Sequence, residues 1–180
     1  MSHSNVTKEM LADAMKKFMT ERPFEKITVG DLVQHCRLNR NSFYYHFKDK
    51  YELVNWIFYH DFIEKLEKDR PLTGWDLLEK LTYFFYENKS FYAKAITITG
   101  YNCFSDYFFE MMQKINVFFV DKCFEETAAD GFYTVFCANI FLASITWWLK
   151  AGTEVPPEKL MGMMKDSAGQ AAFKIVNNLP

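Results

Sequence analysis

The amino-acid sequence predicts an all-α protein with about nine helices. Apolar side chains recur three and four positions apart along most of the 180 residues, and no segment shows the alternation of a half-buried strand. N-cap residues and Pro/Gly breaks divide this pattern into segments of helical length. Hydrophobic residues make up 49% of the chain, which is enough material for a sizeable core.

The N-terminal helices are marked by start and stop signals. A first helix stops before Pro23, and three N-cap residues follow closely, namely Thr28, Asn39 and Asp49. Acidic residues three positions after Thr28 and Asp49 resemble capping boxes. These signals predict two short helices, roughly 28–36 and 39–47, and a longer helix that begins near Asp49.

Five further helices are predicted in the remainder of the chain, separated by Pro- and Gly-containing breaks. Their approximate ranges are 75–88, 89–98, 104–126, 131–152 and 157–178. We divide the chain into an N-terminal three-helix domain with a helix-turn-helix, residues 1–52, and a C-terminal helical bundle, residues 53–180. The first part carries nine Lys/Arg against seven Asp/Glu, a net charge of +2, and the second carries twelve against sixteen, a net charge of −4.

The cysteines and the N-terminus indicate a reduced, cytoplasmic protein. The four cysteines lie far apart without a CxxC pair, at Cys36, Cys103, Cys123 and Cys137. The first residues contain no apolar run of signal-peptide length. The four histidines form no ligand spacing with these thiols, so we predict neither a metal site nor another cofactor.

An uncharged run over residues 132–149 reaches the lower length limit of a membrane-spanning helix. Polar side chains interrupt it at Thr134, Asn139, Ser144 and Thr146, and no basic flank precedes it. The alternative is a helix buried between other helices or between subunits. We expect the second arrangement and no membrane partner.

The stretch Asn39–Leu53, "NRNSFYYHFKDKYEL", combines aromatic rings with cations. On a helix that begins at Arg40, Phe43 and Phe47 share one face and can pack inward. The opposite face presents groups that can meet base edges and phosphates: Arg40, Asn41, Tyr44, Tyr45 and Lys48. The spacing predicts a helix-turn-helix whose second helix enters the major groove. An ordinary solvated face of an amphipathic helix pair is the alternative.

The order of residues from Thr7 to about Leu53 resembles the N-terminal domain of the TetR family of bacterial transcriptional regulators. The matching segments are "ITVGDLVQHC", "LNRNSFYYHF" and "KDKYEL". Further along, "ENKSFYAKAITITGYNCFSDYF" and "ASITWWLKAGTEVPPEKL" look like a subgroup related to regulators of dihydroxyacetone kinase operons. The resemblance implies a transcriptional regulator, taken as a repressor, that binds a palindromic operator in double-stranded DNA as a dimer and is released by a small-molecule effector.

The resemblance also implies roles for individual residues. Tyr44 and Lys50 would contact phosphates, Thr28 would cap the helix that crosses the DNA backbone, and His46 would contact phosphate or pack. Arg37 and Asn41 depart from the family pattern, because many members carry glycine there, and Arg37 adds a phosphate contact. The complete DNA-binding set is Thr28, Arg37, Arg40, Asn41, Ser42, Tyr44, Tyr45, His46, Lys48 and Lys50.

The resemblance implies that the last two helices pair across a two-fold axis in a homodimer, and their apolar stripe, which would be a liability on a monomer, supports dimerisation. An effector pocket is expected among Tyr92, Tyr101, Asn102, Phe104, Tyr107, Met111, Asn139 and Trp147. The alternative is that these aromatic residues are core.

No nucleophile elbow, Gly-rich phosphate loop or metal spacing predicts an enzyme. The competing function is an interaction module of the same fold that a protein partner controls.

Overall fold

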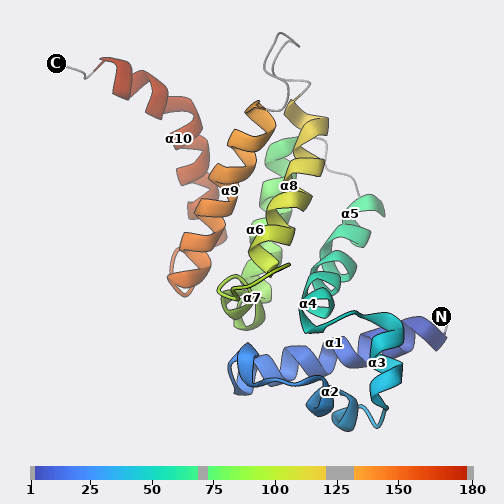
Figure 1. Ribbon diagram of the computed structural model, residues 1–180. Helices are drawn as coiled ribbons and strands as arrows, with labels where there is room; N and C mark the ends of the chain where they lie inside the picture. Colours follow the sequence, from blue (N-terminus) through green and yellow to red (C-terminus); the bar gives the residue numbers. More distant parts are fainter. Residues whose placement is uncertain (1–2, 69–72, 121–131, 178–180) are drawn as a thin grey trace.

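Helices account for all regular secondary structure in the computed structural model (Figure 1), which describes residues 3–68, 73–120 and 132–177, with side chains over 5–66, 73–115 and 135–167. The helices are α1 (His3–Glu21), α2 (Val29–His35), α3 (Arg40–His46), α4 (Lys50–Phe58), α5 (Glu64–Lys68), α6 (Gly74–Glu87), α7 (Lys89–Ala95), α8 (Phe104–Val120), α9 (Phe132–Lys150) and α10 (Pro157–Asn177). A π-helical turn joins α4 to α5. Counting these three as one helix, the described ranges contain nine α-helices and one short 3-10 helix, Phe24–Lys26, and the all-α prediction is confirmed.

The helices form two layers that share α4. In Figure 1, α1, α2 and α3 lie together at the bottom, and α4 leads upward into the bundle that contains α6 to α10. α1 packs against α2, α3 and α4, and its far end reaches α7 of the upper bundle. Leu11, Met15 and Leu32 are fully buried in this lower unit. The lower unit therefore rests on the bundle through both α4 and α7.

The long helix that begins at Asp49 contains a π-helical turn, Tyr59–Ile63, which the sequence did not predict. Its widened hydrogen bonding is visible where the Glu64 N–H donates to the Tyr59 carbonyl. Asp61 within this turn accepts from the Lys16 ammonium of α1 at 2.5 Å. The turn thus lies against the lower unit through a contact with α1 that spans 45 residues of the chain, a separation at which local periodicity carries no signal.

An aromatic cluster fills the centre of the upper bundle. Phe58, Phe85, Tyr92, Phe104 and Phe108 are all buried, with ring centroids from 4.9 to 6.2 Å apart. Edge-to-face and stacked pairs of this kind stabilise a core beyond the area they bury. The cluster joins α4, α6, α7 and α8 into one body.

α7 is shorter than predicted, since it ends at Ala95 instead of at residue 98. Two residues of the connection to α8 have positive φ angles, +122° at Gly100 and +60° at Asn102. Asn55 of α4 donates its side-chain amide to the Asn102 carbonyl at 3.1 Å. This α7–α8 connection is therefore held against α4 by a hydrogen bond from the lower part of the bundle.

α9 contains the long uncharged run, but within the described ranges no helix combines the length and apolarity needed to cross a bilayer. Ala138, Ile145 and Trp148 of α9 are buried against the bundle, while another face is open. Cys36, Cys103 and Cys137 form no disulfide, and Cys123 lies outside the described residues, as do the predicted helical residues 121–126.

Candidate nucleic-acid interface

The start of α2 is fixed by the predicted capping box. Thr28 Oγ1 accepts from the Asp31 N–H at 3.1 Å, and the Asp31 carboxylate accepts from the Thr28 N–H at 2.8 Å. The N–H and the hydroxyl of Thr28, which both donate to the Asp31 carboxylate at 2.8 Å, lower the pKa of Asp31, and Arg22 adds an ion pair at 3.2 Å. Thr28 itself is exposed, so its cap lies at the surface of the lower unit.

The turn between α2 and α3 places an arginine in a left-handed conformation. Arg37 has a φ of +55°, and the Leu38 N–H closes the turn by donating to the Val33 carbonyl at 2.8 Å. Helices commonly end in this way, but the left-handed position is usually glycine because a Cβ is strained there. The exposed Arg37 side chain is therefore held at the turn at a conformational cost.

α3 has the predicted inward and outward faces. Asn39 caps it by accepting from the Ser42 N–H at 2.8 Å, and the Ser42 hydroxyl also donates to Asn39. Phe43 and Phe47 are buried in the core, as the spacing predicted. The opposite side is open to solvent, with Tyr45 81% exposed. The other exposed side chains of this face are Arg40, Asn41 and Tyr44, whereas the exposed Lys48 lies in the turn after α3, because the helix ends at His46 and Phe47 is already extended.

Arg40 is the first residue of α3, and its guanidinium lies beside α2. Its Nη2 is 3.4 Å from the position that a Cβ would take on Gly30, and Thr28 Oγ1 is equally near that position. A Cβ at residue 30 would therefore meet both side chains at ordinary van der Waals distance, so the guanidinium of Arg40 lies beside the first turn of α2 without requiring glycine there.

His46 lies at the end of α3 and is half-buried. Burial lowers its pKa, and the nearby Lys8 lowers it further, so both effects favour the neutral ring. The Lys8 ammonium lies 5.8 Å from the centre of the Phe47 ring and 5.5 Å from that of Trp56. The centre of the His46 ring lies 4.9 Å from that of Tyr45 and 6.3 Å from that of Phe47.

Lys50 is placed differently from the phosphate contact that was expected. Its ammonium donates to the carbonyl oxygens of Phe24 at 2.8 Å, Ile27 at 2.9 Å and Glu25 at 3.4 Å. These three acceptors match the three N–H donors of an ammonium. Burial lowers the pKa of Lys50, although Glu25 opposes this. A phosphate at this position would have to replace carbonyls that already surround the charge.

The capping of α4 also differs in detail from the prediction. Asp49 accepts from the Glu52 N–H at 2.8 Å, as expected for an N-cap. The Glu52 carboxylate, however, accepts from the N–H of Lys48 at 2.5 Å, one residue before the cap. The backbone of the α3–α4 turn is therefore tied down, while the Lys48 side chain stays exposed.

The eight residues expected to form an effector pocket do not line one cavity. Tyr92 and Phe104 belong to the buried aromatic cluster, and Tyr101 is 96% exposed. Asn102 contacts α4 through Asn55. Met111 and Tyr107 pack against the core, and burial raises the pKa of Tyr107 to about 12. The core alternative therefore describes four of the eight, namely Tyr92, Phe104, Tyr107 and Met111.

Asn139 and Trp147 instead line an open groove of about 580 Å³ between α9 and the α7–α8 connection. Hydroxyl groups, apolar side chains and one ammonium share this groove, and its other lining residues are Ile96, Thr97, Ile98, Thr99, Ser105, Leu142, Ala143, Thr146 and Lys150. The wall from residues 96 to 99 follows directly after α7. No group of His, Cys, Asp or Glu side chains suited to a metal ion occurs in the described ranges.

Comparison with known proteins agrees with this arrangement. Residues 11–57 match the family described as bacterial regulatory proteins, tetR family, and residues 75–170 match the one described as transcriptional regulator C-terminal region. The second match covers 96 of the 180 residues, which is more than half of the chain.

A curated relative is the HTH-type dhaKLM operon transcriptional activator DhaS of Lactococcus lactis subsp. lactis (strain IL1403), 35% identical over 100 residues. The match covers 54% of this chain and 53% of DhaS, so it spans about half the length of that relative. A solved structure of the dihydroxyacetone kinase operon activator DhaS has a TM-score of 0.65 at 25% identity, covering 89% of this chain and 93% of that one.

The solved structure of NalD, the secondary repressor of the MexAB-OprM multidrug efflux pump in Pseudomonas aeruginosa, shares the fold with a TM-score of 0.59 at 14% identity. The match covers 90% of this chain and 93% of the NalD chain. The helix-turn-helix geometry, the two family matches and the likeness to DhaS agree with one another. The chain belongs to the TetR family of bacterial transcriptional regulators.

Proposed function

We propose that this regulator binds a palindromic operator in double-stranded DNA as a homodimer and acts as a cytoplasmic repressor. The observation that carries the proposal is the open face of α3, where Arg40, Asn41, Tyr44 and Tyr45 are exposed beside Lys48 of the following turn, while Phe43 and Phe47 anchor the helix from behind. The opposite sign of regulation is the alternative, because DhaS is named an activator and NalD a repressor. Expression of a reporter gene placed behind the selected operator distinguishes repression from activation.

The proposal is tested by selecting bound sequences from a random duplex library and then comparing variants. Replacing Arg40 or Asn41 with Ala should change the preferred bases, at a cost of about 1–3 kcal/mol for the original site. Replacing Lys48 with Ala should weaken binding to all duplexes alike, because a phosphate contact carries no sequence information. The proposal fails if the wild-type protein selects no common sequence.

Arg37→Gly is expected to make the protein more stable and a weaker DNA binder. Relief of the left-handed strain contributes roughly 1–2 kcal/mol, and the added freedom of glycine in the unfolded chain removes about 0.4–1 kcal/mol of that gain. The net increase in the free energy of unfolding is therefore roughly 0.5–1 kcal/mol. Urea denaturation measures this increase, and fluorescence anisotropy with labelled duplex measures the affinity.

Arg37→Ala is the matched control for this prediction. Alanine keeps the strained backbone and removes the charge, so affinity should fall as in Arg37→Gly without the gain in stability. If Arg37→Gly binds duplex as tightly as the wild type, Arg37 is not a DNA contact. If Arg37→Gly is less stable than Arg37→Ala, the left-handed conformation of residue 37 does not strain the wild-type protein.

We propose the division of the chain at residues 52 and 53, with a DNA-binding unit before it and a dimerisation and effector-binding unit after it. Support for the dimer comes from the open face of α9, where Ile140 and Trp147 are exposed, and from the exposed Met163 of α10. A large exposed apolar face is typical of a surface that another chain covers. A two-fold dimer would present two copies of α3 to successive major grooves.

The groove between α9 and residues 96–99 is the better candidate for an effector site than the buried aromatic cluster, because it is open and lined by both polar and apolar groups. Its contacts leave the small molecule unidentified, and the likeness to DhaS carries neither a metabolite nor an operon to this chain. A compound that binds there should weaken operator binding by shifting the population of dimer conformations. The competing proposal, control by a protein partner, predicts instead that operator binding responds to no small molecule in a metabolite screen.

A further inference from the structure

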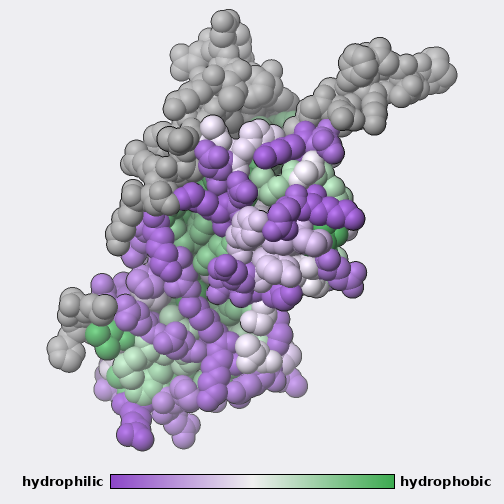
Figure 2. Space-filling view, turned by 180° about the vertical axis from the view of Figure 1, so that it is seen from behind, coloured by the Kyte–Doolittle hydropathy of each residue, from purple (hydrophilic) through white to green (hydrophobic). Residues whose placement is uncertain are grey.

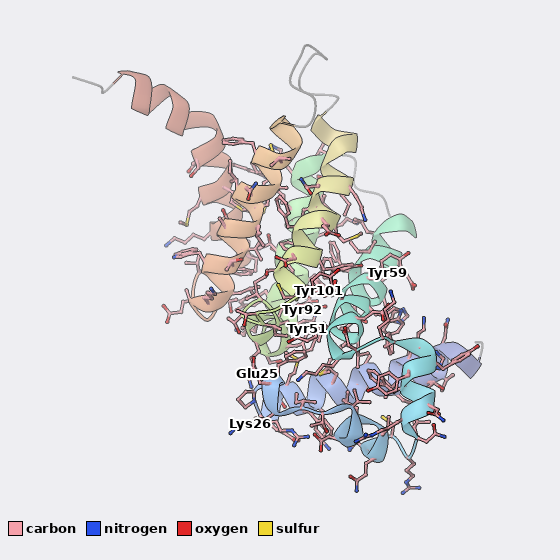
Figure 3. All side chains as sticks on the ribbon, viewed as in Figure 1. Glu25, Lys26, Tyr51, Tyr59, Tyr92 and Tyr101 are labelled. Atoms are coloured by element: carbon pink, nitrogen blue, oxygen red, sulfur yellow. The ribbon has the colours of Figure 1, made fainter. Side chains whose placement is uncertain are left out.

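Two lysines from different parts of the fold bind the carbonyl groups of one short segment. This segment, residues 19–27, is called the connector here, because it runs from the last turn of α1 to the residue before the Thr28 cap of α2. In Figure 3, Glu25 and Lys26 mark the connector at the end of α1, and Tyr51 lies above them where the lower unit meets the bundle. Any shift of the connector moves α2 and, with it, α3.

Lys50 binds the second half of the connector from α4. Its ammonium donates to the carbonyls of Phe24, Glu25 and Ile27, and it lies 4.1 Å from the centre of the Phe24 ring. Ile27 is the last residue before the Thr28 cap. Lys50 therefore fixes where α2 begins relative to α4.

Lys94 binds the first half of the connector from α7. Its ammonium donates to the Met19 carbonyl at 2.5 Å and to the Thr20 carbonyl at 3.0 Å. The last carbonyls of a helix lack intrahelical partners and favour a cation. Lys94 is solvent-exposed, which weakens its bonds relative to those of Lys50. It is nevertheless a direct polar contact between the effector-binding unit and the end of α1.

Lys94 also lies close to the groove described above. It occupies the last turn of α7, and residues 96–99, immediately after it, form one wall of that groove. The α7–α8 connection also contacts α4, because the Tyr51 hydroxyl of α4 lies 3.5 Å from the Thr99 carbonyl. A molecule or subunit in the groove would therefore press on the residues that set the position of Lys94.

We propose that Lys50 and Lys94 form a two-lysine clamp on the connector and are positioning residues for DNA binding, not phosphate ligands. Lys50 sets the helix-turn-helix against α4, and Lys94 links it to the effector-binding unit. This inference rests on the proposed DNA-binding function. The clamp makes two separable predictions, one about duplex binding and one about the protein without DNA.

The duplex experiment separates positioning from phosphate binding through the salt dependence of affinity. Each phosphate contact contributes about 0.9 to the slope of log K against log salt, so losing one contact per subunit lowers the slope of a dimer by about 1.8. Lys50→Met should weaken binding about tenfold and Lys94→Met roughly threefold to tenfold, both with an unchanged slope. Lys48→Met, which removes an exposed candidate phosphate contact, should lower the slope.

Lys89→Met is the matched control for Lys94→Met. Lys89 lies on the same helix, but its ammonium lies 4.5 Å from the centre of the Tyr86 ring. Its replacement should leave duplex affinity unchanged. Lys94→Arg should recover part of the affinity, because a guanidinium can also donate to two carbonyls.

Hydrogen exchange without DNA tests the clamp independently of the proposed function. The backbone amides of residues 19–36 should exchange about tenfold faster in Lys94→Met and Lys50→Met than in the wild type or Lys89→Met. Circular dichroism checks that each variant remains helical, and Lys94→Arg provides a folded variant if Lys94→Met is unstable. If exchange is faster in the Lys50→Met and Lys94→Met variants but the wild-type protein binds no duplex, the clamp is supported and the DNA-binding function is rejected.

The clamp is overturned if the salt slope of Lys50→Met falls as far as that of Lys48→Met, because Lys50 is then a phosphate ligand. It is also overturned if exchange over residues 19–36 is the same in Lys94→Met and Lys89→Met. Unchanged duplex affinity in both Lys50→Met and Lys94→Met would equally reject a positioning role.

Discussion

Ile140→Asp is expected to convert the regulator from a dimer to a monomer and to abolish tight operator binding. Ile140 is 44% exposed on α9, and Trp147 is 52% exposed two turns further along the same face. An aspartate buried without a partner in an apolar interface costs roughly 3 kcal/mol or more in the free energy of dimerisation, which is at least a hundredfold in the dimer dissociation constant. Sedimentation equilibrium measures this constant directly.

The Ile140→Asp variant should also lose operator affinity, although Ile140 is not expected to contact DNA. A palindromic site is read by two copies of α3, and a monomer offers only one. Val6→Asp is the matched control, because Val6 is an aliphatic residue of similar exposure, 41%, on α1 in the lower unit. A monomeric wild-type protein, or an Ile140→Asp variant that remains dimeric with normal operator binding, would falsify the assignment of this face.

Phe43→Ala is expected to destabilise the helix-turn-helix by about 3–5 kcal/mol. Phe43 is fully buried, and its ring lies 5.8 Å from that of Phe47. Truncation leaves a cavity behind α3, at the point where the helix is anchored to the lower unit. Thermal and urea denaturation, followed by circular dichroism, should show a lower midpoint, and duplex binding should be lost because α3 is no longer held in place.

Tyr45→Ala separates stability from recognition. Tyr45 lies two residues from Phe43 on the opposite side of α3 and is 81% exposed, so its removal should change the free energy of unfolding by less than about 0.5 kcal/mol. Its loss should nevertheless weaken duplex binding. If both variants are equally unstable, the two faces of α3 are not distinct; if neither changes duplex binding, α3 is not the recognition helix.

Most of the surface of the lower unit in Figure 2 is hydrophilic, in keeping with a face open to a charged partner.

The local features of the DNA-binding unit were predictable because their physical causes lie within a few residues of one another. Thr28 and Asp31 are three apart, as are Asn39 and Ser42, so the caps depend on side chains that any start of a helix brings together. The burial of Phe43 follows from the four-residue period of a helix face in the same way. The left-handed turn at Arg37 had no comparable signal, because the residue type argues against it.

The residues expected to line an effector pocket were harder to place, because an aromatic residue carries the same helical signal whether it fills a core or lines a groove. Tyr92 and Tyr101 lie nine residues apart and received the same role, yet one is 1% and the other 96% exposed. The difference arises where α7 ends and Gly100 turns the chain outward with a φ of +122°. The groove itself combines residues 96–99 with α9, which are separated by about forty positions in the chain.

The sequence by itself determined the helical fold, the positions of the helix starts, the two faces of α3 and the family. These depend on periodicity and capping, which act over one or two helical turns. Only the tertiary structure decided that Lys50 faces three carbonyls 23–26 residues earlier in the chain and that Lys94 reaches carbonyls 74–75 residues away. An ammonium binds phosphate and carbonyl oxygens alike, so its partner depends on which acceptor the fold brings within hydrogen-bonding distance.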